Sequence, residues 1–133
     1  FYNVATQEES YADPGHPSER YHQKSHGESF LALAQQEFRP QGLYLLDEPE
    51  AALSPQRQMS LLVEIARCAA QGSQFIIASH SPILLAMPEA EILYFDANGI
   101  RPCAYEETDS YRITKLFLDD RKRILHHLLG GIE

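Results

Sequence analysis

Few residues of this sequence are of the types that build disulfide or zinc frameworks. Its 133 residues include no tryptophan and only two cysteines, Cys68 and Cys103, which do not form a Cys-x-x-Cys pair. Such spacing indicates neither a zinc site nor a disulfide framework. It favours two reduced thiols in the core of a cytoplasmic protein.

Long apolar runs and a secretory signal are also missing from the sequence. The longest apolar stretches, residues 42–46 and 75–78, have the length of strands. A membrane-spanning helix needs about 20 predominantly apolar residues. Since no signal peptide opens the sequence either, we expect a cytoplasmic protein with no direct membrane insertion.

Basic residues are outnumbered by acidic ones. The 11 lysines and arginines stand against 19 aspartates and glutamates, which gives a formal net charge of −8. This balance argues against a free-standing electrostatic clamp on DNA, so nucleic-acid contact has no support from the charge. The remaining composition, 44% hydrophobic and 23% charged, is that of one globular domain with a core.

The first part of the chain is expected to be a polar, mobile segment followed by a helix. Residues 1–24 contain prolines and glycine without a sustained helical or strand period. Farther on, Phe30, Ala34 and Phe38 recur at a spacing of four residues. That spacing is typical of the buried stripe of a short amphipathic helix.

Two buried strands joined by a helix are predicted next. Residues 43–46 and 75–78 are continuous apolar runs, as expected of parallel strands that are covered on both faces. Between them, Ser54 and Pro55 have the residue types preferred at the N-cap and first position of a helix. The apolar face of that helix is expected to consist of Met59, Leu62, Val63, Ala66, Ala69 and Ala70.

The last third of the chain predicts a further helix start, a hairpin and two helices. Residues 79–82 again combine capping residues with a proline, and residues 92–95 and 100–104 flank a turn that contains Asn98 and Gly99. Residues 108–129 are expected to form two helices broken near Asp119 and Asp120. The predicted fold class is α/β, with a mainly parallel sheet, flanking helices and an antiparallel edge hairpin.

Asp47 and Glu48 end the first predicted strand, where open α/β sheets place their ligands. Adjacent side chains on a strand point to opposite faces, so the two acids should have separate roles. One could hold a hydrated Mg²⁺ while the other orients or deprotonates a water molecule. The alternative is that both are solvated turn residues at the end of a strand.

Two further segments carry polar residues suited to binding phosphate. Ser25 and Glu28 have the spacing of a capping box, and Gly27 leaves the N-terminus of the following helix open to an anion. His80 follows the second predicted strand, beside the first one, and could hydrogen-bond a phosphate oxygen or a water molecule. Each also has a plain structural explanation, as a helix cap.

The order of these motifs resembles that of the ABC-type ATPase superfamily, within the P-loop nucleotide hydrolases. The resemblance covers residues 21–95 and rests on Lys24-Ser25-His26-Gly27-Glu28 for the signature motif, Leu43-Tyr44-Leu45-Leu46-Asp47-Glu48-Pro49 for Walker B, Ala51-Ala52-Leu53-Ser54 for the D-loop and Ser79-His80-Ser81-Pro82 for the switch-histidine loop. His26, Glu28 and Ser54 depart from the residues most common in these motifs.

The resemblance implies a Mg²⁺-dependent ATP hydrolase that acts as a homodimer with ATP sandwiched between its subunits. By this resemblance Asp47 holds Mg²⁺ through its water shell, Glu48 polarises the attacking water and His80 contacts the γ-phosphate. Nucleotide-binding roles fall to the signature and D-loop residues Ser25, His26, Gly27, Glu28 and Ser54.

One motif of the family is absent from the 133 residues. No Gly-x-x-x-x-Gly-Lys-Ser/Thr sequence occurs, and the resemblance implies that this Walker A loop lies upstream. We therefore expect one partial ATPase domain, with its core in residues 25–105 and C-terminal helices in residues 106–133. The chain alone should bind ATP weakly and be inactive.

The details of the motifs are more similar to those of soluble predicted ATPases related to recombination and chromosome-maintenance enzymes than to those of transporters. Two alternatives stay open at this stage. One is the nucleotide-binding subunit of an ABC transporter, with a membrane partner. The other is a non-catalytic module that uses the same fold for dimerisation or for binding a partner.

Overall fold

The computed structural model describes the backbone of residues 26–130 and the side chains of residues 30–130. The chain divides into two compact units, residues 1–87 and 88–133, each of which is described here by itself. The polar segment predicted over residues 1–24 lies outside the described residues. No helix of residues 26–130 is both long and apolar enough to cross a membrane.

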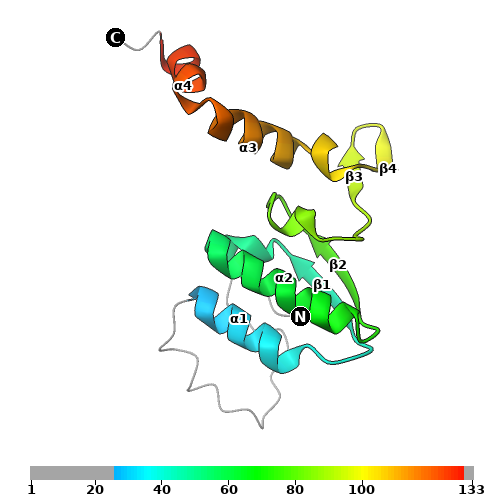
Figure 1. The fold of residues 1–133 in the computed structure, drawn as a ribbon. Coiled ribbons are helices and arrows are strands. Elements are labelled where there is room, and N and C mark those ends of the chain that lie inside the picture. The colour runs from blue at the N-terminus through cyan, green and yellow to red at the C-terminus, as the bar shows by residue number, and fades with distance from the viewer. Residues whose placement is uncertain (1–25, 131–133) are drawn as a thin grey trace. The chain divides into compact units, whose positions relative to one another are not determined.

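The described part of the first unit contains two α-helices and a pair of parallel strands (Figure 1). In chain order its elements are α1 (His26–Glu37), β1 (Leu43–Asp47), the 3-10 helix η2 (Pro49–Ala52), α2 (Pro55–Ala69), β2 (Gln74–Ala78) and the 3-10 helix η3 (Leu84–Ala86). β1 and β2 pair in parallel from Leu43 opposite Gln74 to Asp47 opposite Ala78. The predicted α/β class, with a parallel strand pair connected through a helix, is confirmed.

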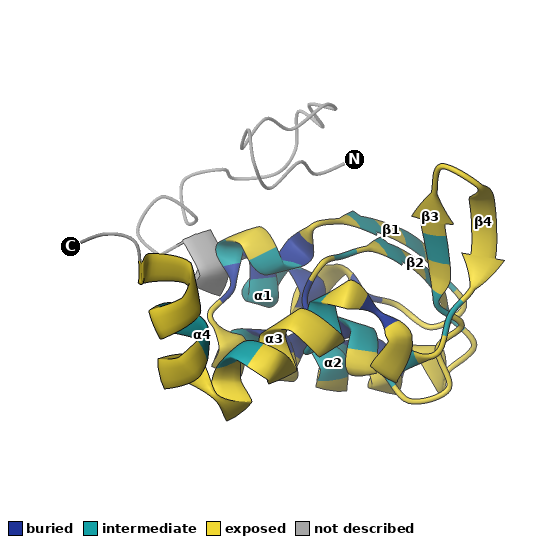
Figure 2. Ribbon diagram, turned by 90° about the horizontal axis from the view of Figure 1, so that it is seen from above, coloured by how far each residue is buried: buried dark blue, intermediate teal, exposed yellow. Residues whose placement is uncertain are grey.

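The core of this unit lies between the two helices and one face of the strands (Figures 1 and 2). Phe30, Ala34 and Phe38 are buried, as their spacing predicts. The apolar face predicted for α2 is wrong, because Met59 and Val63 are exposed. The helix instead buries Gln58, Leu61, Ile65 and Cys68. Apolar residues of α2 lie on more than one of its faces, and the face with the bulky Leu61 and Ile65 is the one that packs against the core.

The expectation that both faces of the strands are covered is not met by the residues described. Alternate residues of β1 and β2 are half-buried and exposed, and Leu43, Leu45 and Ile76 are among the exposed ones. The half-buried Tyr44, Leu46, Phe75 and Ile77 pack against the core. Within the described part of the first unit, residues 26–87, α1 and α2 therefore cover one face of the strand pair and leave an apolar face open.

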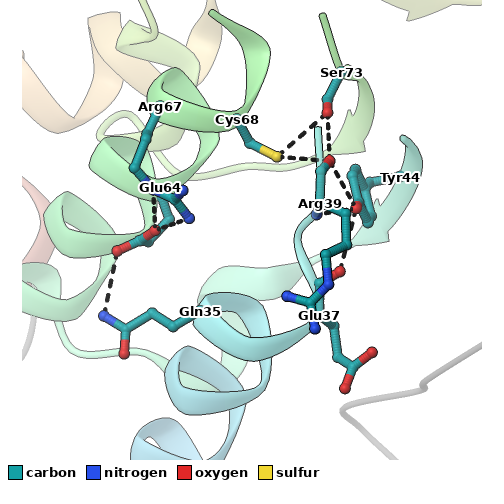
Figure 3. A network of polar contacts seen from close by, with 8 residues as sticks. All are labelled: Gln35, Glu37, Arg39, Tyr44, Glu64, Arg67, Cys68 and Ser73. Atoms are coloured by element: carbon teal, nitrogen blue, oxygen red, sulfur yellow. Dashed lines mark hydrogen bonds and ion pairs between the residues drawn. The ribbon is translucent and has the colours of Figure 1, made fainter. Parts of the chain in front are cut away.

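A polar network ties the loop after α1 to the turn before β2 (Figure 3). The hydroxyl of Tyr44 accepts a hydrogen bond from the Arg39 backbone N–H and lies 3.2 Å from the Glu37 and Arg39 carbonyl oxygens. The Arg39 carbonyl also accepts from the Ser73 hydroxyl at 2.7 Å and from the Cys68 thiol at 3.1 Å. The buried thiol of Cys68 is therefore hydrogen-bonded, and the loop is held at a fixed place beside the sheet.

The segment after β2 differs from the predicted helix. Only the three residues of η3 are helical, and it is the Ser81 hydroxyl that accepts hydrogen bonds from the Ile83 and Leu84 backbone N–H groups. Pro88 follows the element closely, and a residue that precedes a proline is disfavoured in the helical conformation. The cap-plus-proline start is present, but the helix ends within a turn.

The second unit contains a hairpin followed by helices. Its elements are β3 (Leu93–Asp96), β4 (Gly99–Pro102), the 3-10 helix η4 (Tyr105–Glu107), α3 (Asp109–Asp119) and α4 (Arg121–Leu129). The hairpin is antiparallel as predicted, but its two-residue loop is Ala97–Asn98, with Gly99 as the first residue of β4 at φ 122°. It also forms a sheet of its own instead of an edge of the parallel pair.

The two predicted C-terminal helices are confirmed, with their break at Asp120. Thr108 caps α3 and Asp120 caps α4 through side-chain oxygens that accept backbone N–H groups. Most residues of both helices are exposed (Figure 2). The Asp109 carboxylate accepts a hydrogen bond from the Tyr94 hydroxyl at 3.0 Å, which raises the pKa of that phenol. This contact links the hairpin to the start of α3.

Candidate functional site

The carboxyl ends of β1 and β2 meet at one edge of the parallel pair, and the predicted acidic residues lie there. Asp47 is the last residue of β1, opposite Ala78 of β2. The backbone N–H of Glu48 continues the ladder by donating to the Ala78 carbonyl at 2.8 Å. Asp47 and Glu48 are both exposed. Their carboxylates therefore remain available to solvent or to a ligand.

Glu48 has a left-handed backbone conformation, with φ 44° and ψ 51°. For a residue with a side chain this conformation costs about 1–3 kcal/mol. Its backbone is held on both sides, because its carbonyl accepts the Ala51 N–H at 3.0 Å and the next residue, Pro49, is buried. The chain thus turns sharply at Glu48. The direction of the Glu48 side chain is therefore not set by the alternation of side chains along the strand.

His80 lies beside Glu48. The His80 Nε2 and Glu48 Oε1 atoms are 3.7 Å apart, and the two side chains are 85% and 58% exposed. The predicted placement of His80 next to the first strand is confirmed. An exposed imidazole and carboxylate at this distance can hydrogen-bond the same water molecule, and the imidazole can instead donate to a phosphate oxygen.

The loop that carries His80 is fixed by polar residues that sequence reasoning had not singled out. Glu50 Oε1 accepts from the Ser79 hydroxyl at 3.0 Å and from the His80 backbone N–H at 2.6 Å. The buried Gln58 accepts from the Ser81 hydroxyl and donates to the Leu53 carbonyl at 3.0 Å. Gln58 has a sequence signal, since a polar residue stands there on the stripe that continues with Leu61. Glu50 has none beyond its proximity to Glu48.

Ser54 acts in the structure as the predicted N-cap of α2. Its side-chain oxygen accepts the Arg57 backbone N–H at 3.4 Å, and its φ and ψ of −61° and 157° are those of a cap residue. The first helical residue is Pro55, also as predicted. The nucleotide-binding role implied for Ser54 stays a prediction.

Replacing Ser54 by alanine tests the cap. We expect Ser54→Ala to lower the free energy of unfolding by about 0.5–2 kcal/mol, because one N–H of the first turn loses its acceptor. Equilibrium urea denaturation measures the effect. Ser60→Ala is the matched control, since that exposed hydroxyl only donates to the Gln56 carbonyl within the helix. An equal loss in both variants would contradict the capping role.

The signature residues are described only in part. Ser25 lies outside the described residues, and His26, Gly27 and Glu28 form the first turn of α1. The helix predicted to follow Ser25 is therefore confirmed. Free backbone N–H groups at such a start suit an anion. The phosphate contacts of these four residues stay predictions.

The residues at the strand ends suit Mg²⁺ better than a metal that needs a full protein cage. No group of three or more His, Cys, Asp or Glu side chains that could hold a metal occurs among residues 30–130, whose side chains the structure describes. Mg²⁺ keeps most of its water and is typically bound by one or two carboxylates together with substrate phosphates. The exposed Asp47 carboxylate, beside Glu48, fits such an ion when a phosphate is bound.

Comparison with known protein families gives a match to part of the chain. Residues 28–86 are similar to a family described as "AAA domain, putative AbiEii toxin, Type IV TA system". No curated protein and no solved structure matches the chain. The matched segment contains Asp47, Glu48 and His80 and lies within the first unit. It supports a relation to the AAA-type P-loop NTPases, and so a nucleotide-binding, ATPase-like domain.

Proposed function

We propose that this chain supplies the Walker B and switch-histidine half of a Mg²⁺-dependent ATP hydrolase of the ABC type. The observation that carries the proposal is the 3.7 Å approach of Glu48 Oε1 and His80 Nε2 at the carboxyl ends of two parallel strands. The similarity of residues 28–86 to an AAA-type family supports nucleotide as the ligand.

The proposed mechanism assigns one task to each side chain. Glu48 accepts a hydrogen bond from the attacking water and orients it toward the γ-phosphorus. His80 donates a hydrogen bond to a γ-phosphate oxygen, where negative charge has to be stabilised. Asp47 holds the water shell of Mg²⁺, and the ion when bound neutralises charge on the phosphate oxygens.

A phosphate loop has to come from elsewhere, because the 133 residues contain no Gly-x-x-x-x-Gly-Lys-Ser/Thr sequence. We propose that it belongs to an upstream segment and that two subunits enclose ATP. Ser25 and Gly27 then contact the γ-phosphate of the nucleotide held by the opposite subunit, with His26, Glu28 and Ser54 near the same nucleotide. The chain alone is expected to show no turnover.

Removal of the metal or of its carboxylate tests this function in the full-length protein. We expect phosphate release from ATP to stop when Mg²⁺ is chelated, and Asp47→Asn to lower kcat by about 10²-fold or more, because a positioned metal contributes several kcal/mol to the transition state. A coupled phosphate assay measures both.

Glu64→Gln is the control for the loss of one carboxylate. Glu64 lies in α2 with a side chain that is 17% exposed; its Oε2 pairs with Arg67 Nη2 at 2.9 Å, and its Oε1 accepts from Gln35 Nε2 at 3.3 Å. The kcat of the Glu64→Gln variant should match that of the unaltered protein. Turnover that persists without divalent metal, or an Asp47→Asn variant with full activity, would overturn the proposed role of Asp47.

A further inference from the structure

We infer that Glu50 is a positioning residue that holds His80 beside Glu48, an inference that rests on the proposed function. Glu50 stands in η2, two residues after Glu48, and its carboxylate reaches the loop after β2. Oε1 accepts from the His80 backbone N–H at 2.6 Å and from the Ser79 hydroxyl at 3.0 Å. One carboxylate oxygen thus fixes two consecutive residues of the other loop.

The contact completes a double connection between the two loops at this edge of the strands. The first connection is the hydrogen bond from the Glu48 N–H to the Ala78 carbonyl, at 2.8 Å. The second is the carboxylate of Glu50. Glu48 donates its backbone N–H in the first connection, and His80 donates its backbone N–H in the second. The 3.7 Å separation of their side chains is therefore set by backbone positions on both loops.

The anchoring leaves the imidazole itself free to meet a ligand. The His80 side chain is 85% exposed, although its backbone N–H is engaged by Glu50. A hydrogen bond to an ionised acceptor is about twice as strong as one between neutral groups. Glu50 therefore restrains the backbone of His80, from which the imidazole extends, and does not bond to the nitrogen atoms of the ring.

The second oxygen of Glu50 lies in a less favourable environment than the first. Oε2 is buried and has no hydrogen-bond partner among the residues that the structure describes. A buried carboxylate oxygen without a donor costs stability and calls for an explanation. Alignment of the His80 loop is the explanation that the contacts of Oε1 provide.

Gln58 holds the same loop at a different residue and so provides a matched control. The Ser81 N–H donates to the Ser79 hydroxyl oxygen at 3.0 Å, and the Ser81 hydroxyl donates to Gln58 Oε1. Gln58→Leu removes this support at a similar side-chain volume. It leaves the hydrogen bond between Glu50 and the His80 N–H in place.

The anchoring is tested without nucleotide by hydrogen exchange of the His80 amide, followed by NMR in the full-length protein. We expect Glu50→Ala to raise its exchange rate by about 10- to 100-fold relative to core amides, as a lost charge-assisted hydrogen bond predicts. Glu50→Gln should give an intermediate rate, because an amide oxygen still accepts. It also carries the test if Glu50→Ala does not fold.

Turnover then distinguishes positioning from a merely structural role. We expect Glu50→Ala to lower kcat by about 10- to 100-fold, the cost of a misplaced group in the transition state, with a smaller change in KM for ATP. Glu50→Gln should recover part of kcat. Gln58→Leu, compared at a temperature where both variants are folded, should keep both kcat and the relative exchange of the His80 amide closer to normal.

The outcomes separate this inference from the function on which it rests. If the full-length protein without substitutions hydrolyses no ATP, the proposed function fails, whatever the His80 amide shows. If it does hydrolyse ATP, normal kcat in Glu50→Ala overturns the inference even where exchange is faster. Equal losses of kcat in Glu50→Ala and Gln58→Leu overturn it too, because they would reflect general loosening of the loop.

Discussion

Glu48→Gln is expected to lower kcat for ATP hydrolysis by about 10²–10⁴-fold in the full-length protein, the usual contribution of a general base. Glutamine has nearly the same shape and keeps an oxygen near His80 Nε2, which lies 3.7 Å from Glu48 Oε1. It lacks the negative charge that polarises the attacking water. ATP binding and ATP-driven dimerisation should persist, since Glu48 is not assigned to either.

The measurements for this variant are single-turnover phosphate release and light scattering with and without ATP. Glu89→Gln is a matched control, because Glu89 is also an exposed glutamate with a positive φ, 61° against 44° for Glu48. The same substitution in a similar backbone conformation should leave kcat unchanged. Turnover at the normal rate in Glu48→Gln would remove Glu48 from its proposed role.

The part of the site that could be predicted is the part that depends on strand order. A helix with an N-cap at Ser54, between two apolar runs, predicts two parallel strands with their carboxyl ends at one edge. The residues that follow those ends must then be neighbours. For this reason the placement of His80 beside the end of the first strand could be predicted although His80 follows Glu48 by 32 positions, and the structure confirms that placement.

The support of the site could not be predicted, because it depends on side-chain reach and not on periodicity. Glu50 contacts the His80 loop from the end of the neighbouring strand. The spacing of residues along the sequence does not indicate such a contact. The left-handed turn at Glu48 is also hidden, since glutamate has no marked preference for that conformation. Only Gln58, a polar residue on a buried stripe, has a signal in the sequence.

The error over α2 has a related cause. Met59, Leu61, Val63 and Ile65 alternate along the helix, so more than one face is apolar enough to be a core face. The choice between them is made by the partners that pack there, which are α1 and the half-buried face of the strands. A sequence pattern gives the period of a helix more securely than its rotation about its own axis.

The side of α2 that faces the core is tested by truncating its most buried residue. Leu61 is 0% exposed and lies in the core cluster with Phe30 and Ile65. We expect Leu61→Ala to lower the free energy of unfolding by about 2–5 kcal/mol, because it removes buried methyl groups and leaves a cavity. Equilibrium urea denaturation followed by circular dichroism measures the change.

Val63→Ala on the same helix is the control, because Val63 is 66% exposed. It should change the free energy of unfolding by no more than about 0.5 kcal/mol, as is usual for surface substitutions. The reverse order of effects would mean that α2 packs through the Met59 and Val63 face, as the sequence alone suggested. Since α2 connects β1 to β2, a loosened Leu61→Ala variant should also lose the protection of the His80 amide at lower urea concentrations than Val63→Ala does.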